Sequence, residues 1–148
     1  MKRTARILLS LVMVVTLLSA AFSYAAEQPL YPIGEVTIDA MAVAAGVGFS
    51  WGDGKLKFQG KEYPFSVKGL SVGAAGFSKI NAVGDVYNMK NASDFAGNYV
   101  AVEGGLTLAK GAAGLIMRNA KGVIINMRTA QQGVQLSLGV DGFYIVMK

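Results

Sequence analysis

The residue types that most often carry chemistry in proteins are scarce in this chain. Its 148 residues include no histidine and no cysteine. Zinc and copper sites are built mainly from imidazole and thiolate ligands, so the sequence offers no ligand set for either metal. It also lacks a calcium loop of the DxDxDG type. We therefore expect no metal ion and no cofactor.

The stretch GLSVG at 69–73 has the spelling of a hydrolase nucleophile motif, with Ser71 at its centre. A nucleophile elbow requires a histidine base near the serine, and the chain contains none. The alternation of apolar residues around it gives another interpretation. In a regular strand the apolar face that includes Val67 would continue at residue 69, but the next apolar residue is Leu70, one position later. The sequence therefore predicts a β-bulge at Gly69.

A second glycine-rich stretch, WGDGKL at 51–56, raises the question of a phosphate site. A phosphate loop needs GxxxxGK[ST] or GxGxxG between a strand and a helix, and neither spacing is present. Asp53 and Gly54 tolerate the positive φ that a tight turn demands, and they lie between two alternating runs. The sequence predicts a β-hairpin turn at Asp53–Gly54.

Carboxylates are the remaining candidates for catalysis, as in the acid pairs that hydrolyse glycosidic bonds. Of the nine acids, Asp53 and Asp141 are assigned to turns, and those near the amino end are set aside. Of the others we single out Asp85, Asp94 and Glu103, but the sequence places no two of them at a working distance. We expect that the protein is not an enzyme. A glycan-acting enzyme with two carboxylates is the third of three interpretations.

The elements that must position any site are predicted to be strands. Short runs alternate apolar and polar residues, and turn-forming residues separate them; the runs are KLKFQ at 55–59, YPFSV at 63–67, GVIINMRT at 122–129 and GVQLSLG at 133–139. In the third run, Ile125 and Met127 share one side, against Asn126 and Arg128. This period of two predicts an all-β fold, a small antiparallel β-barrel with short hairpins.

The segment VTIDAMAVAAGVGFSW at 36–51 alternates bulky and small residues. Met41 and Trp51 belong to the bulky set, and Ala40 and Ser50 to the small set. One interpretation is a track of small residues that a lipid chain or another backbone approaches closely. The other is one long bent strand in a tight barrel, where crowding forbids large side chains. We favour the bent strand, because glycine within strands commonly marks bends.

The main interruption of the sheet pattern is NMKNASDFAGNYV at 88–100. Asn91 or Ser93 is suited to cap a single helical turn that contains Asp94 and Phe95. Such a loop is a place where function often resides. The interpretation that we favour is a short helical or loop crossover that seals one end of the barrel, with Phe95 as its plug.

Residues 1–25 have the pattern of a signal peptide. Three basic residues precede an apolar run at 7–22, and Ser23 and Ala25 occupy the small-residue positions of a cleavage site. Cleavage would leave a single β-barrel domain at 26–148 and place it in the periplasm. The alternative is an uncleaved anchor, since 20 uncharged residues are just enough to span a bilayer.

Export changes the interpretation of the net charge, which is +5 for the whole chain. Without the leader, 11 of the 14 basic residues remain, against nine acidic ones. The lysines are scattered singly, whereas a nucleic-acid-binding face shows clustered basic residues. We expect no nucleic-acid partner.

Five glycine-rich or apolar motifs follow one another along the chain, and their order is informative: WGDGKL, GLSVGAAG, VYNMKNASDF, GNYVAVEGGLTLAKG and GVQLSLGVDGF. Their order and spacing, from about Gly46 onward, resemble the EipA family of bacterial envelope-integrity proteins. The resemblance implies a periplasmic small β-barrel that maintains the cell envelope. A weaker similarity links the glycine-rich sheet to lipid-binding domains of the Ysc84 type. Carried over by position, four residues fall in the recurring central motif and are our candidates for ligand binding: Tyr87, Asn88, Asp94 and Phe95.

These observations predict an exported periplasmic β-barrel with a non-catalytic binding or structural role in cell-envelope integrity. Its expected partner is an envelope component, which is a lipid, a glycan or an envelope protein. The alternative is a lipid-binding or outer-membrane-associated barrel that meets a membrane surface.

Overall fold

The computed structural model describes residues 2–10, 29–45, 47–72, 76–103, 107–108, 114–131, 136–138 and 142–148. For 42–45, 47–49, 71–72 and 76–78 it describes the backbone and not the side chains. Residues 2–10 are helical. In the described part of the chain, no helix is long and apolar enough to cross a bilayer. The predicted cleavage site at Ser23 and Ala25 lies outside the described residues.

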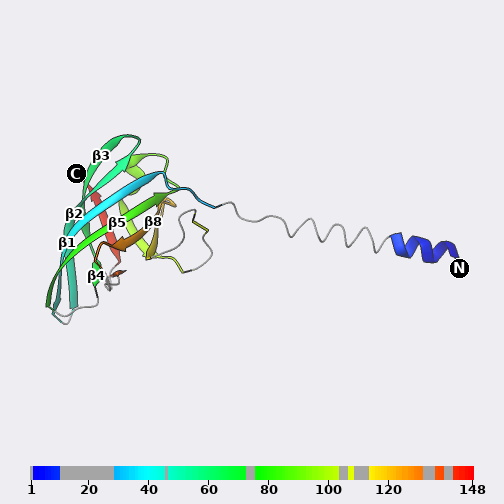
Figure 1. Ribbon diagram of the computed structural model, residues 1–148, viewed down its shortest axis with the longest axis horizontal. Coiled ribbons are helices and arrows are strands. Elements are labelled where there is room, and N and C mark those ends of the chain that lie inside the picture. The colour runs from blue at the N-terminus through cyan, green and yellow to red at the C-terminus, as the bar shows by residue number, and fades with distance from the viewer. Residues whose placement is uncertain are drawn as a thin grey trace.

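The predicted small all-β barrel is confirmed. Eight of the described strands form a closed barrel in the order β1-β2-β3-β10-β6-β7-β8-β5, and all neighbouring pairs are antiparallel (Figure 1). The barrel strands are β1 (Gly34–Ala45), β2 (Val47–Phe58), β3 (Lys61–Lys68), β5 (Gly76–Tyr87), β6 (Gly97–Ala101), β7 (Leu115–Asn119), β8 (Ile124–Thr129) and β10 (Phe143–Met147). Two short strands, β4 (Leu70–Val72) and β9 (Leu136–Leu138), pair with each other outside the barrel.

The crossover predicted at 88–100 is also confirmed. The chain leaves β5, forms the 3₁₀ helix η2 (Ala92–Phe95) and enters β6, which lies elsewhere in the barrel. Asn91 is the N-cap residue, although its side chain makes no cap hydrogen bond. Phe95 is fully buried and packs edge-on against Phe65, with ring centroids 5.0 Å apart. It therefore fills the barrel end, as a plug would.

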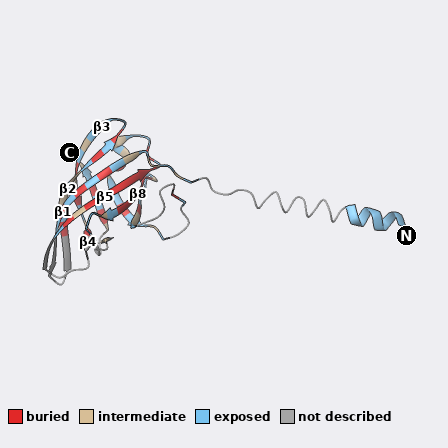
Figure 2. Ribbon diagram, viewed as in Figure 1, coloured by how far each residue is buried: buried red, intermediate tan, exposed pale blue. Residues whose placement is uncertain are grey.

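The barrel interior is a packed apolar core. On β2 and β3, the alternation predicted from the sequence holds, because Leu56, Phe58, Phe65 and Val67 are buried (Figure 2). Larger side chains complete the same cluster, including Tyr99, Phe143, Met117, Ile125 and Met127. The interior of the described barrel is thus occupied by its own side chains.

A second, smaller cluster lies on the outer face of β5 and β8. It contains Tyr87, Leu108 and Ile124, with Leu30 packed against them. Leu30 and Leu108 form a parallel bridge, and the Leu30 amide donates to the Thr107 carbonyl at 2.9 Å. We call residues 29–33 and 107–108 the strap. The strap covers part of the outer face, which explains why Ile124 of β8 is buried there. Asn126 on the same face is also buried, contrary to its predicted polar side.

The hairpin turn predicted at Asp53–Gly54 is wrong. β2 continues through both residues, and the turn lies at Gln59–Gly60, where φ is 51° and 75°. Asp53 points outward from the strand and pairs with Lys148 at 2.7 Å, which lowers the pKa of its carboxyl. Gly54 faces inward, where a Cβ would lie 2.7 Å from the Thr37 carbonyl oxygen. Gly54 is therefore needed because the neighbouring strand β1 and the Phe65 ring approach its backbone closely, and not because the chain turns there.

The single bent strand predicted over 36–51 is also wrong. The segment belongs to two strands that reverse between Ala45 and Val47, which are paired with each other. The predicted crowding is present, because Gly52 faces Ala40 so closely that a Cβ would lie 2.5 Å from the Ala40 Cα atom. Ala40 and Ser50 are buried, and the bulky Met41 and Trp51 are exposed.

The interruption predicted at Gly69 is present, but its form differs from a bulge. Gly69 separates β3, which belongs to the barrel, from β4, which belongs to the two-stranded sheet. Its φ is +92°, and its amide donates to the Ser50 carbonyl at 3.3 Å. The change of apolar phase in the sequence therefore marks a change of sheet.

Candidate functional site

Two of the four predicted binding residues, Tyr87 and Asn88, lie where β5 ends. Tyr87 is fully buried in the cluster under the strap, and its hydroxyl has no hydrogen-bond partner among the described residues. Burial and the nearby Asp85 charge raise the pKa of the Tyr87 hydroxyl. Asn88 follows with φ of 56°, which asparagine tolerates better than most residues. Its side-chain amide donates to the Gly122 carbonyl at 3.0 Å.

The other two lie on η2 and face different surroundings. Phe95 is in the barrel core, whereas Asp94 is partly exposed and pairs with Lys121 at 3.6 Å. Both Asn88 and Asp94 thus contact the turn between β7 and β8. The structure does not gather the four residues around one hollow, and each has a packing or turn contact that explains it. Their predicted role in ligand binding stays a prediction.

Sequence reasoning missed the residue that joins these parts. Asn119, at the end of β7, is buried, and its amide donates to the Asp94 carbonyl at 2.7 Å and to the Tyr99 hydroxyl at 3.3 Å. Its side-chain oxygen accepts from the Lys121 and Val123 amides at 3.1 and 3.0 Å. The Tyr99 hydroxyl in turn donates to the Phe95 carbonyl at 2.7 Å, and burial raises the pKa of Tyr99. This network fixes the crossover to the β7–β8 turn.

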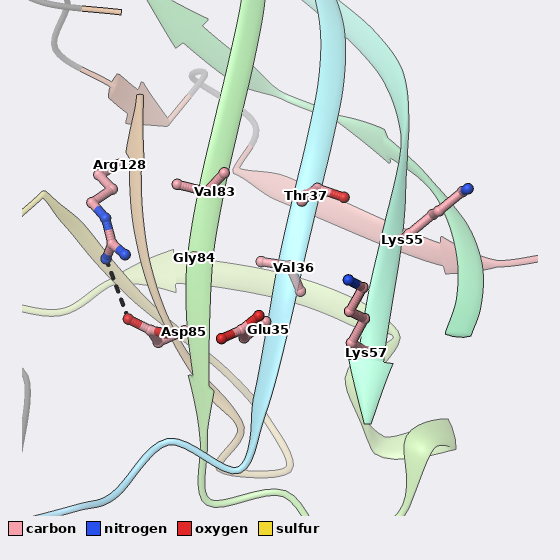
Figure 3. Close-up of a pocket in the computed structure, with 9 residues that line it drawn as sticks. All are labelled: Glu35, Val36, Thr37, Lys55, Lys57, Val83, Gly84, Asp85 and Arg128. Carbon is pink, nitrogen blue, oxygen red and sulfur yellow. Dashed lines mark hydrogen bonds and ion pairs between the residues drawn. The ribbon is translucent and has the colours of Figure 1, made fainter. Parts of the chain in front are cut away.

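A different place, on the outer face of the barrel, has the character of a binding site. A hollow of about 180 Å³ crosses β2, β1, β5 and β8 (Figure 3). We call it the outer groove. Its lining residues are Glu35, Val36, Thr37, Lys55, Lys57, Val83, Gly84, Asp85 and Arg128. A second hollow continues it toward the Gln59–Gly60 turn and shares Glu35 and Lys57 with it.

Charges of both signs line the outer groove. Glu35 and Asp85 are direct cross-strand neighbours on β1 and β5, and Lys57 is the partner of Glu35 on the other side. Figure 3 shows Arg128 and the two carboxylates toward one side of the groove and the two lysines toward the other. Like charges directly opposite each other on a sheet are unfavourable unless cations compensate them. Arg128 and Lys57 supply that compensation.

Asp85 is the most constrained charge in the outer groove. It is only 2% exposed, and its carboxylate accepts a hydrogen bond from the Arg128 guanidinium at 3.2 Å. A buried carboxylate is retained only when it is paired or hydrogen-bonded. Arg128 is about half exposed, so its guanidinium is also open to a ligand. The pair forms one wall of the groove, and the exposed side chains of Lys55 and Lys57 line the other side.

The three acids singled out for the third interpretation do not come together. Asp85 pairs with Arg128, and Asp94 pairs with Lys121 on a different element. Glu103 lies after β6 and lines neither of the two hollows. The carboxylate beside Asp85 is Glu35, which the sequence reasoning set aside for its position near the amino end. Within the described residues, no group of three or more carboxylates is placed to hold a metal ion.

The outer groove offers charged groups of both signs to a ligand. Lysine and arginine side chains can donate to a carboxylate or phosphate, and the Glu35 carboxylate can accept from an ammonium or hydroxyl group. The described residues around it include no nucleophile with an adjacent base. In comparisons with known proteins, the chain matches no protein-family model, no curated protein and no solved structure.

Proposed function

We propose that this chain is exported to the periplasm and acts there as a non-catalytic binding protein of the cell envelope. The observation that carries the proposal is the outer groove, which places two carboxylates between cations on a rigid sheet face. The signal-peptide pattern and the motif order shared with EipA-like proteins support the compartment and the envelope role.

The polarity of the barrel supports a water-facing protein. Its described interior is apolar, and its outer face carries Glu35, Lys55, Lys57 and Glu62 on adjacent strands. A transmembrane barrel has the reverse arrangement, with an apolar band outside. The packed core also favours a ligand on the outside of the barrel over a lipid carried within it.

The ligand that best fits the outer groove carries both an ammonium and a carboxylate group. Lys57 and Arg128 lie on opposite sides of the groove, and either can meet the carboxylate while Glu35, between them, meets the ammonium. In the bacterial envelope, the peptide stems of peptidoglycan present such groups on an otherwise polar polymer. We therefore propose cell-wall peptide as the ligand class.

Export is tested by osmotic shock of cells that express the full chain. We expect the protein in the shock fluid without detergent, with Ala26 as its first residue by mass spectrometry, because Ser23 and Ala25 suit signal peptidase. Recovery of the intact chain in the detergent fraction alone would contradict export of a processed protein.

Ligand binding is tested by co-sedimentation with purified peptidoglycan sacculi. We expect Lys57→Glu to weaken binding about fivefold, since it replaces one exposed attraction by a repulsion. Lys61→Glu is the matched control, because Lys61 is exposed, carries the same charge and lines neither hollow. Equal binding by both variants, or no sedimentation of the parent protein, would overturn the assignment of the groove.

A further inference from the structure

Three stretches of the sequence without charged residues have their described parts at one end of the barrel. No charged residue occurs in 40–52, in 69–78 or in 129–140. The first two stretches meet where Ala44 pairs with Gly76, and the last two meet where β4 pairs with β9. The described parts of these three stretches thus lie together at the end of the barrel opposite η2.

A row of exposed side chains borders this end. Across five adjacent strands, the direct neighbours in register are Lys79, Met41, Trp51, Lys68 and Tyr144. Met41, Trp51 and Tyr144 are 39%, 50% and 43% exposed, and both lysines are exposed. We call this row the belt. It is separated from the outer groove by the row that contains Asp39, Asp53 and Asn81.

The register continues the apolar character beyond the belt. Val43, Phe49 and Phe77 occupy neighbouring positions two residues further along β1, β2 and β5, toward the uncharged end. The three strands are 12 residues long and extend past their shorter neighbours in the barrel (Figure 1). The uncharged end is therefore also the projecting end.

We propose that this end of the barrel docks on the surface of an anionic lipid bilayer. Tryptophan and tyrosine prefer the headgroup level, where one side of the ring is apolar and the other wet. Lysines beside them reach anionic phosphates while their stems lie along apolar surface. The uncharged strand ends beyond the belt enter the headgroup layer without burying a charge.

Charge complementarity selects a bilayer over a second copy of this chain. A two-fold dimer through the belt would gather four lysines, Lys68 and Lys79 of each copy, into one interface. Like charges at an interface oppose association, whereas an anionic surface attracts both lysines. The inference goes beyond the proposed function, since the belt and the outer groove are separate and bind different partners.

The chain contains a single tryptophan, so its fluorescence reports on the belt alone. We expect the Trp51 emission to shift to the blue when vesicles of phosphatidylglycerol and phosphatidylcholine are added to the full chain. Lipids brominated in the acyl chain should quench it. Vesicles of phosphatidylcholine alone should give little shift. An apolar leader that bound the vesicles would not move the emission of Trp51.

The lysines of the belt are tested by the double variant Lys68→Glu/Lys79→Glu, which keeps Trp51. We expect partition to anionic vesicles to fall about 30-fold or more, because each lysine near an anionic surface contributes to binding. The control is Lys61→Glu/Lys90→Glu, which changes the charge equally at exposed positions near the opposite end. It should partition as the parent does.

Three results would overturn the proposal. The first is vesicle binding without a shift of Trp51, and the second is equal partition of the two double variants. The third is a concentration-dependent shift without vesicles, together with a doubled mass in solution, which would show that the belt joins two copies. Failure here leaves the sacculus experiment unaffected, because that experiment probes the groove without lipid.

Discussion

Replacing Gly69 by alanine is expected to lower the free energy of unfolding by about 3 kcal/mol. The φ of +92° is costly for any residue with a Cβ atom. The new methyl group would also overlap the carbonyl oxygen of Gly142, in the backbone that leads into β10. That backbone is fixed by pairing on both sides of β10, so it cannot move away without disturbing β3 or β6. Urea denaturation followed by far-ultraviolet circular dichroism measures the loss.

Gly60→Ala is the matched control for this prediction. Gly60 also has positive φ, at +75°, but a Cβ there would meet nothing within 4 Å. We expect a loss of about 1 kcal/mol, from the backbone conformation alone. If Gly69→Ala were no more harmful than Gly60→Ala, the close approach of Gly69 to Gly142 would be refuted.

The second large effect is expected at Asn119. Its replacement by alanine should cost about 3–4 kcal/mol, because several buried and partly buried polar groups lose their partner at once. The Asp94 carbonyl, the Lys121 amide and the Val123 amide all bond to this side chain. We expect the crossover with η2 to loosen first, so that amide hydrogen exchange near Phe95 rises before the whole barrel unfolds. Denaturant titration measures the loss of stability, and hydrogen exchange measures the loosening of the crossover.

Asn88→Gly provides the comparison for Asn119. The Asn88 side chain also donates to the β7–β8 turn, but it is exposed and makes a single bond there. Glycine adopts the left-handed backbone of this position freely, so the net change should be within about 1 kcal/mol. A loss at Asn119 as small as that at Asn88 would show that the buried network does not hold the crossover.

The sequence predicted the barrel because alternation is a property of single strands. Leu56, Phe58, Phe65 and Val67 face inward, as their period of two indicated, because inward and outward positions alternate in any strand. The crossover at η2 was predictable for a related reason: alternation stops there and turn-forming residues take over. Both features depend on neighbours in the chain.

The wrong hairpin shows the limit of local turn signals. Asp53–Gly54 has the preferred composition of a tight turn, yet the outward positions Trp51, Asp53 and Lys55 continue one alternation without a break. That unbroken phase was the signal against a turn. Tertiary crowding explains the glycines, since Gly52 and Gly54 lie against β1 and β3 inside the barrel. Close approach between strands is not visible in a local pattern.

The outer groove could not be predicted from one sequence, because it depends on strand order. Glu35 and Asp85 are 50 positions apart and become neighbours only because β1 pairs with β5. Arg128 joins them through the pairing of β8 with β5. The belt has the same origin, with five residues drawn from five strands. The sequence shows which charged residues are present, but the pairing of strands in the closed barrel determines which of them become neighbours.

The place of β10 has a consequence for the order in which the barrel forms. This strand, residues Phe143–Met147, lies between β3 and β6 and pairs with both. Until β10 is in place, β3 and β6 therefore each have one open edge. Open edges invite pairing with other chains. Insertion of β10 closes both edges at once and completes the barrel.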